Sequence, residues 1–594
     1  MIDVVLLLAP YRDAGVLSPA DVHTAASLAR LAHIDSADVV LAVALAARAP
    51  RFGHVCVDLH TVADTVAAET ETDTESIESV RRLHWPQPDG WLDAVSTSTL
   101  VSAANAPLVV DGSRLYLERY HRYEHDVALH LQRRSATPVS TITPSPEVLD
   151  SLLTGEGSQQ QRVAVDAALS RDLTVLVGGP GTGKTTTVAA LLATLVRADA
   201  ELRIALAAPT GKAAARLGEA FRQAAQHLPD HLAPLLASAE TSTIHRLLGV
   251  QWNSRTRFRH DRHRPLPHDV VIIDETSMVS LPLMAKLLDA VRPDARLVLV
   301  GDPGQLASVE AGSVLADVAG PVAEGQSAVG PLAGCVSALQ YSRRFPPGSP
   351  LDRLARAVRA GDAAQALAVL RDPAGEVAGR GALRWLALSG ADTEAASEIR
   401  GLAVPAAMQV HRHAVSGDAA AALTSVESLR VLCAHRKGTF GVERWNARIE
   451  GWLATEGMAV RGWYVGRPVL VTANDYRNNL YNGDLGVVVV EGSRSLVAFA
   501  GVEGVRLFGS AQLESVETVH AMTIHKSQGS EFDHVVVVLP PADSPLATRE
   551  LLYTAITRAR RQVTVVGDQA SIEAAINRQV TRSSGLRDLL WPSS

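Results

Sequence analysis

The sequence predicts an α/β protein with two parallel-sheet cores, a small β-barrel inserted into the second core and a mainly helical N-terminal region. Apolar runs of strand length alternate with helical patterns over residues 173–300, and the alternation returns over 431–566. Short strands separated by Asn-Gly and Gly-Ser turns between residues 468 and 499 predict the barrel.

The length sets the number of domains. A chain of 594 residues should hold about three or four of them. We expect an N-terminal docking domain at 1–145, a first core at 146–345, a second core at 346–462 and 516–594, and the barrel at 463–515.

The composition is typical of a globular protein that works inside the cell. Hydrophobic residues make up 47% and charged residues 20%, and a net charge of −7 offers no global basic surface for nucleic acid, so local patches must carry any such binding. The three cysteines have no metal-ligand spacing and suit a reducing compartment as small buried side chains. The apolar N-terminus lacks a basic n-region and a small-residue cleavage site, so we predict no signal peptide, and the Ala-rich run at 39–47 is too short to span a bilayer. We therefore expect a cytoplasmic protein with no membrane partner.

The region before residue 146 shows elements but no catalytic group. Helical patterns cover 20–31 and 37–47, and a hairpin is predicted at 107–117 across Asp111 and Gly112. The acidic stretch 69–78 is interpreted as a solvated loop or helix start, and the Ser/Thr/Pro-rich stretch 138–157 as a linker. A docking module is the simplest interpretation of this region.

A Gly-rich octad follows the strand at 173–177 and precedes a helical pattern. It fits G-x-x-x-x-G-K-S/T, the phosphate-binding loop, in which curled backbone N–H groups and a helix N-terminus face an anion. Lys184 would contact the β- and γ-phosphates and the Thr185 hydroxyl would ligate Mg²⁺. The predicted nucleotide-binding residues of this loop are Gly178, Gly179, Pro180, Gly181, Thr182, Gly183, Lys184, Thr185 and Thr186.

Two further strands end in polar residues. The apolar run 270–273 delivers Asp274 and Glu275 at its carboxyl end, where ligands of open α/β sheets bind. Asp274 would hold the Mg²⁺ shell, and Glu275 would orient or deprotonate a water. Gln305, after the strand 297–300, is positioned to sense the γ-phosphate.

Other polar residues leave alternatives open. Gln161, one helix before the loop strand, could recognise adenine and could equally be a polar side chain exposed to water. The segment 255–264, with five arginines and two histidines around Phe258, suits a nucleic-acid strand but also a solvated charged hairpin. Arg558 suggests an arginine finger on the γ-phosphate, although a helix-end surface arginine would look the same.

An ordered set of motifs identifies a resemblance. The chain contains GGPGTGKT, APTGKAA, TIHRLLG, IIDE, GDPGQL, the step Arg344-Phe345, TIHKSQGSEFD and YTAITRAR. This set resembles superfamily 1 helicases, and in detail the RecD family, the alpha subunits of bacterial exodeoxyribonuclease V (RecBCD). The resemblance covers nearly the whole chain and implies two RecA-like P-loop NTPase cores with an inserted SH3-like barrel.

The resemblance also implies roles for single residues. Gln161 would contact adenine, and Gly529 and Glu531 the sugar-phosphate side of the nucleotide. Gln305, Arg344 and Arg558 would contact the γ-phosphate from both sides of the cleft, with Arg344 favoured over Arg343 because it directly precedes Phe345. The expected single-strand DNA path is lined by Pro209, Thr210, His245, Thr523, His525 and Lys526.

The implied activity is that of an ATP- and Mg²⁺-dependent 5′→3′ DNA helicase and translocase acting in double-strand break repair and DNA degradation. The implied partners are single-stranded and duplex-end DNA and RecB-like and RecC-like subunits in a heterotrimer, with the N-terminal domain docking on the RecC-like subunit. Nuclease activity would belong to a partner, since no further carboxylate cluster is evident.

Two alternatives compete with this interpretation. A stand-alone RecD-like helicase usually carries a longer N-terminal extension with helix-hairpin-helix elements, which this sequence does not show. An ATP-switched DNA-binding subunit without unwinding could dispense with Glu275 or Arg558, and both are present.

Overall fold

A six-stranded parallel sheet forms the first core. In the computed structural model the strands lie in the order β6-β5-β7-β8-β4-β9. Their bounds are β4 (Leu173–Gly178), β5 (Ile204–Ala208), β6 (Glu240–Thr243), β7 (Val270–Ile273), β8 (Arg296–Gly301) and β9 (Val336–Leu339). Every residue of β4 and β8 is buried, because helices cover both faces of the sheet.

Successive residues of each strand pack on opposite layers of helices. Val175 and Val177 belong to a core shared with α16, α17, α9 (Glu118–Ser135) and α25 (Leu586–Leu590), whereas Leu176 packs with α10–α13. The helices of this core are α10 (Pro146–Leu152), α11 (Ser158–Leu169), α12 (Lys184–Ala198), α13 (Gly211–Ala225), α14 (Ala233–Ala237), α15 (Ile244–Leu248), α16 (Leu281–Ala290) and α17 (Val314–Ala323).

The structure describes residues 3–66, 79–80, 82–136, 142–237, 239–251, 257–327, 329–372, 381–387, 393–475, 477–501 and 504–592. The acidic stretch 69–78 and the start of the basic segment, through residue 256, lie outside these ranges. Within them, no helix combines the length and the apolar character that crossing a bilayer requires.

The second half of the predicted linker is helical. Residues Pro146–Leu152 form α10, and the Ser145 hydroxyl caps this helix by accepting from the Val148 N–H at 3.5 Å. Val148, Leu149 and Leu152 are buried against the first core. The linker prediction was wrong here because its Ser and Pro residues are a helix start rather than a break.

The second core is a five-stranded parallel sheet in the order β10-β19-β18-β11-β17. Its strands are β10 (Ala382–Leu386), β11 (Leu429–Cys433), β17 (Ala521–Thr523), β18 (Phe532–Val538) and β19 (Ala559–Val566). Its helices are α18 (Pro350–Ala360), α19 (Ala363–Arg371), α20 (Thr393–Val415), α21 (Ala419–Val426), α22 (Val442–Thr455), α23 (Arg549–Ile556) and α24 (Gln569–Asn577). Strand β10 was not predicted from the sequence.

An antiparallel sheet interrupts the second core where short strands were predicted. Strands β12 (Pro468–Val471), β13 (Leu485–Glu491), β14 (Arg494–Gly501), β15 (Gly504–Phe508) and β16 (Val516–Thr518) pair in the order β15-β14-β13-β12-β16. Its inner face holds Val469, Val488, Val497 and Phe499. The short strands predicted between residues 468 and 499 are confirmed as β12, β13 and β14, and they lie between β11 and β17.

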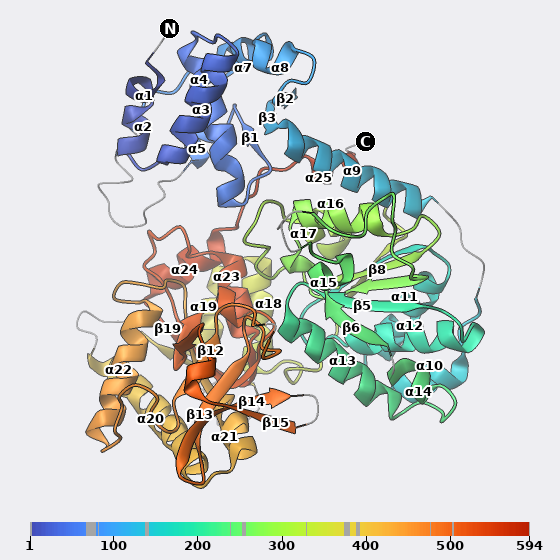
Figure 1. The fold of residues 1–594 in the computed structure, drawn as a ribbon, viewed down its shortest axis with the longest axis vertical. Coiled ribbons are helices and arrows are strands. Elements are labelled where there is room, and N and C mark those ends of the chain that lie inside the picture. Colours follow the sequence, from blue (N-terminus) through green and yellow to red (C-terminus); the bar gives the residue numbers. More distant parts are fainter. Residues whose placement is uncertain are drawn as a thin grey trace.

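The N-terminal region is mainly helical, as predicted, and lies at the top of the view in Figure 1. Its helices are α1 (Val4–Leu7), α2 (Ala9–Asp13), α3 (Pro19–Leu31), α4 (Ala37–Arg48), α5 (Val62–Thr65), α7 (Pro88–Ser96), α8 (Thr99–Ser102) and α9 (Glu118–Ser135). Strands β1 (Cys56–Asp58), β2 (Leu108–Asp111) and β3 (Arg114–Leu117) form an antiparallel sheet, so the predicted hairpin is confirmed. The last helix of the chain, α25 (Leu586–Leu590), lies beside α9 (Figure 1).

Candidate functional site

The Gly-rich loop joins the end of β4 to the first residue of α12. Gly181 and Gly183 have φ of 75° and 82°, the left-handed conformation that glycine adopts without strain. The Thr182 hydroxyl donates to the Gly179 carbonyl at 2.9 Å, and the Lys184 ammonium donates to the carbonyls of Gly178 and Gly179 at 2.8 and 3.0 Å. The loop therefore holds a half-buried cation at a helix N-terminus, an arrangement that suits a phosphate chain.

Gln161 reaches the same loop from α11. Its Nε2 donates to the Gly183 carbonyl at 3.1 Å, and its Oε1 is buried with no hydrogen-bond partner in the described part of the chain. A buried amide oxygen without a partner is costly, so a donor brought by a ligand would stabilise it. The exocyclic amine of adenine is such a donor.

Asp274 and Glu275 follow β7, whose neighbour β8 also pairs with β4. Glu275 has a left-handed backbone with φ 50°, and its N–H donates to the Asp274 carboxylate at 2.8 Å. Burial raises the pKa of Asp274, and the charge of Glu275 adds to this effect. Burial lowers the pKa of Lys184, while nearby carboxylates, Asp302 foremost, oppose that shift. The two carboxylates and the loop lysine thus share one electrostatic environment.

Gln305 and Arg558 join the two cores directly. Gln305 lies after β8, is 6% exposed, and donates from Nε2 to Asp302 at 3.1 Å. Its Oε1 accepts from Arg558 Nη2 at 2.9 Å. Arg558 is 3% exposed, and burial lowers its pKa. The alternative of a surface arginine at position 558 is therefore wrong.

Arg344 and Glu531 form a second link between the cores. The Arg344 guanidinium pairs with the Glu531 carboxylate and donates to the Thr557 carbonyl at 2.6 Å. Burial alone would raise the pKa of Glu531, but the charges of Arg344 and Arg216 lower it to about 2. Arg343, by contrast, donates to backbone carbonyls at Thr154 and Glu156 of the first core.

The phosphate-loop side of the site contains a tyrosine that the sequence analysis did not select. A Cβ at Gly179 would lie 2.9 Å from the Tyr553 hydroxyl, so this side chain from α23 abuts the loop. Burial raises the pKa of Tyr553, and the charge of Asp302 contributes. Tyr553 could have been selected because it opens the motif YTAITRAR. It was missed because, from sequence alone, an aromatic residue in a helical pattern is expected to pack in the hydrophobic core.

The predicted DNA-contacting residues of the first core lie at the carboxyl ends of β5 and β6. Pro209 and Thr210 follow β5, and the Thr210 hydroxyl caps α13 by accepting from Ala213 N at 3.2 Å. His245 is on α15, its ring 5.9 Å from that of Phe258, and burial lowers its pKa.

The remaining predicted DNA-contacting residues lie at edge strand β17 of the second core. Thr523 ends β17, and its hydroxyl accepts from the Lys526 N–H at 3.2 Å. The Lys526 ammonium donates to Glu517 at 2.9 Å, so this lysine is paired rather than open. Burial lowers the pKa of His525.

The two sets approach each other near Gly529. A Cβ at Gly529 would lie 3.8 Å from the Thr210 hydroxyl, and Lys212 Nζ donates to Ser530 Oγ at 2.8 Å. Burial lowers the pKa of Lys212 to about 8. A Cβ at Gly211 would lie 2.7 Å from Cβ of Tyr481, so the loop between β12 and β13 also reaches this junction.

Family models match three parts of the chain. The N-terminal domain of the RecBCD enzyme subunit RecD matches residues 13–116, an AAA domain matches 161–311, and a UvrD-like helicase C-terminal domain matches 518–566. The first covers the helical region with the hairpin. The other two cover the Gly-rich loop with its carboxylates, and the segment from β17 to β19.

Curated relatives match over much longer stretches. The RecBCD enzyme subunit RecD of Mycolicibacterium smegmatis is 48% identical over 590 residues, 98% of each chain. The RecBCD enzyme subunit RecD of Mycobacterium tuberculosis H37Rv is 46% identical to this chain, and the alignment covers 97% of this chain and 95% of that protein. The ATP-dependent RecD2 DNA helicase of Deinococcus radiodurans is 33% identical over 80% of this chain but only 58% of its own length. End-to-end similarity at nearly half of all positions shows that this chain belongs to the RecD family of RecBCD subunits.

Proposed function

We propose that this chain is an ATP-dependent 5′→3′ DNA helicase and translocase subunit of a RecBCD-type helicase–nuclease, acting in double-strand break repair and DNA degradation. The hydrogen bond between Gln305 and Arg558 carries the proposal, because it connects the strand ends of one core to an arginine of the other. A triphosphate bound at Lys184 would lie beside this link, so its binding and hydrolysis would change how the cores are held together.

The roles of single residues belong to this proposal. Lys184 and the loop N–H groups would hold the phosphates, Gln161 the adenine, and Gly529 and Glu531 the sugar-phosphate side. Glu275 would orient or deprotonate the attacking water, and Gln305, Arg344 and Arg558 would contact the γ-phosphate.

The Mg²⁺ ion would be held by Thr185 and Asp274. Their hydroxyl and carboxylate oxygens are the hard donors that Mg²⁺ prefers, and Asp274 is half-buried and lies close enough to Lys184 for that charge to act on its pKa. When bound, the ion would neutralise charge on the β- and γ-phosphates.

The architecture and partners complete the proposal. The proposed domain division is the one expected from the sequence, in which the antiparallel sheet would be an SH3-like insertion. DNA would follow Pro209, Thr210, His245, Thr523, His525 and Lys526 across both cores. RecB-like and RecC-like subunits would complete a cytoplasmic heterotrimer, with the N-terminal domain on the RecC-like subunit, and nuclease activity would arise only in the complex.

The test is ATPase activity of the purified chain with and without single-stranded DNA. We expect strong stimulation by DNA, and Lys184→Gln should lower the stimulated rate about 100-fold or more because it removes a charge aimed at the transferred phosphoryl group. Lys437→Gln, an exposed lysine after β11, is the matched control. Activity indifferent to DNA would contradict the translocase assignment for the isolated chain and favour an ATP-switched subunit. If DNA stimulates the ATPase activity, unwinding of partial duplexes with 5′ or 3′ tails tests the polarity of translocation.

A further inference from the structure

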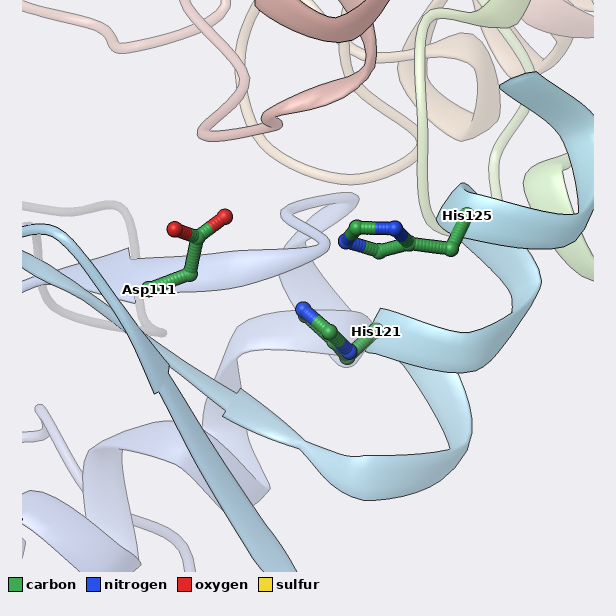
Figure 2. A group of neighbouring side chains, drawn as sticks. All are labelled: Asp111, His121 and His125. Carbon is green, nitrogen blue, oxygen red and sulfur yellow. The ribbon is translucent and has the colours of Figure 1, made fainter. Parts of the chain in front are cut away.

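Three potential metal ligands converge in the N-terminal region, away from the nucleotide site. Asp111 ends strand β2, and His121 and His125 lie on the first turns of α9. One ligand atom of each lies within 4.8 Å of the other two. Figure 2 shows both imidazole rings and the carboxylate directed toward the same small space.

Local structure explains why these side chains meet. His121 and His125 are four residues apart on a helix, so they share one face, and their ring centroids are 4.2 Å apart. The fully buried ring of Tyr116 packs against His121 at 5.1 Å and supports its orientation. Gly112, with φ 57°, turns the hairpin immediately after Asp111, opposite the helix.

This donor set has the chemistry of a transition-metal site. Two imidazole nitrogens and one carboxylate oxygen are ligands that Zn²⁺ accepts, with a water in the fourth position. Ligand atoms around tetrahedral zinc lie about 3.3 Å apart. Side-chain movements that shorten the distances between these ligand atoms by about 1–1.5 Å would therefore bring them to coordination geometry. We propose that Asp111, His121 and His125 bind one Zn²⁺ ion.

A Zn²⁺ ion at this position would connect the hairpin of β2 and β3 to helix α9. Helix α9 begins at the hairpin and ends on the first core, where the Arg134 guanidinium donates to the carbonyls of Val291 and Ala295 at 2.9 and 2.7 Å. A metal bridging Asp111 to His121 and His125 ties the hairpin to this helix. The ion therefore stiffens the joint between the N-terminal region and the motor core, and it does so without taking part in ATP hydrolysis.

The test is metal binding by the full-length chain after chelator treatment and dialysis. Zn²⁺ is titrated by calorimetry, and Co²⁺ is titrated with visible absorption as the report on its ligands. We expect one equivalent per chain, lost in His121→Ala and His125→Ala and weakened at least about tenfold in Asp111→Asn. Hydrogen exchange of residues 118–125 should slow when Zn²⁺ is added to the wild type.

Two controls make the result specific. His23→Ala removes an exposed histidine of α3 in the same region and should keep the equivalent. Asp274→Asn should also keep it, which separates it from any ion held between the two cores. Circular dichroism shows whether each variant is folded. The proposal is overturned if the wild type takes up no Zn²⁺ at micromolar concentration, or if the equivalent persists in both folded histidine variants.

Discussion

Adjacent arginines at 343 and 344 contact different parts of the molecule. Arg344 reaches Glu531 and Thr557 in the second core, whereas Arg343 stays on carbonyls of the first core. Because Arg344 contacts the second core, a ligand that binds between the cores can change its contacts. Arg343 hydrogen-bonds only within the first core and therefore contributes to the stability of that core.

This difference predicts different effects on turnover. Arg344→Ala should lower the DNA-stimulated kcat about 100-fold, because one preorganised charge at the phosphoryl group is lost. Arg343→Ala, the matched control, should leave kcat near the wild-type value and affect thermal stability instead. Steady-state ATPase assays at saturating DNA measure both, and equal losses of kcat in the two variants would contradict the assignment.

His520 predicts a pH dependence in the second core. Its Nε2 lies 2.8 Å from the Tyr464 hydroxyl, and burial, with the charges of Arg430 and Arg467, lowers its pKa to about 3. Below pH 6.5 the His520 imidazole is protonated in the unfolded state but stays neutral in the folded state. The free energy of unfolding therefore decreases as the pH falls from 6.5 toward 3. His520→Asn removes this titration.

The stability advantage of wild type over His520→Asn should shrink by about 1.4 kcal/mol per pH unit between pH 6 and 4. Hydrogen exchange of the amides of β11 and β17 reports the opening free energy of this sheet. His23→Asn, which replaces an exposed histidine of α3 in the N-terminal region, is the control variant. A constant difference between wild type and His520→Asn would show that His520 is not neutral in the folded state.

At the scale of elements, the Gly-rich loop depends on close contacts with its neighbours. A Cβ at Gly183 would lie 2.2 Å from Gln161 Nε2, and the residue has a φ of 82°. The glycine here is required both by the backbone conformation and by the approach of α11.

Gly183→Ala should therefore weaken ATP binding by at least about tenfold, since a left-handed non-glycine residue alone costs about 1–2 kcal/mol. Gly401→Ala is the control, because this glycine of α20 has open space around its Cβ position and ordinary helical geometry. Titration with a fluorescent ATP analogue measures both. Adding Gln161→Ala should relieve the clash but not the backbone strain, so only partial recovery is expected.

At the scale of the whole molecule, the segment 582–591 joins the N-terminal region to the first core. The Arg582 guanidinium donates to the carbonyls of Ser308, Glu310 and Gly312 at 2.6, 3.1 and 2.9 Å. The next residue, Ser583, donates its N–H to His54 Nδ1 at 3.0 Å. The end of the described chain thus bridges two regions that are far apart in the sequence (Figure 1).

Arg582→Ala should destabilise this joint by about 2–4 kcal/mol, because it leaves three backbone carbonyls without their donor. Arg587→Ala, which removes an exposed pair with Glu324, should cost less than about 1 kcal/mol. Hydrogen exchange of β1 and α25 measures the effect, and equal protection in both variants would contradict it. The variant should still bind ATP, since the nucleotide loop lies elsewhere.

Local patterns were sufficient for much of this protein. Strand, loop and helix around Lys184, the carboxylates after β7, the 108–117 hairpin and the interrupted second core all appear where periodicity and turn chemistry predicted them. These features depend on residues within about a dozen positions of one another, which is the range over which spacing fixes a face or a turn. Strand β10 and helix α10 were missed because edge strands and short capped helices carry weak patterns.

Contacts between distant segments were decided by the tertiary structure alone. Arg558 and Gln305 are 253 residues apart, yet their hydrogen bond distinguishes a buried link between cores from a surface arginine. Three other contacts also join segments far apart in the sequence and were not predictable from local patterns. They are the contacts of Arg344 with the second core, the approach of Tyr553 to Gly179, and the hydrogen bonds of Arg582 to the first core. The sequence by itself determined which chemical groups each loop carries. Only packing decided which groups lose water and find partners across the cores, because burial is a property of the assembled surfaces and not of local spacing.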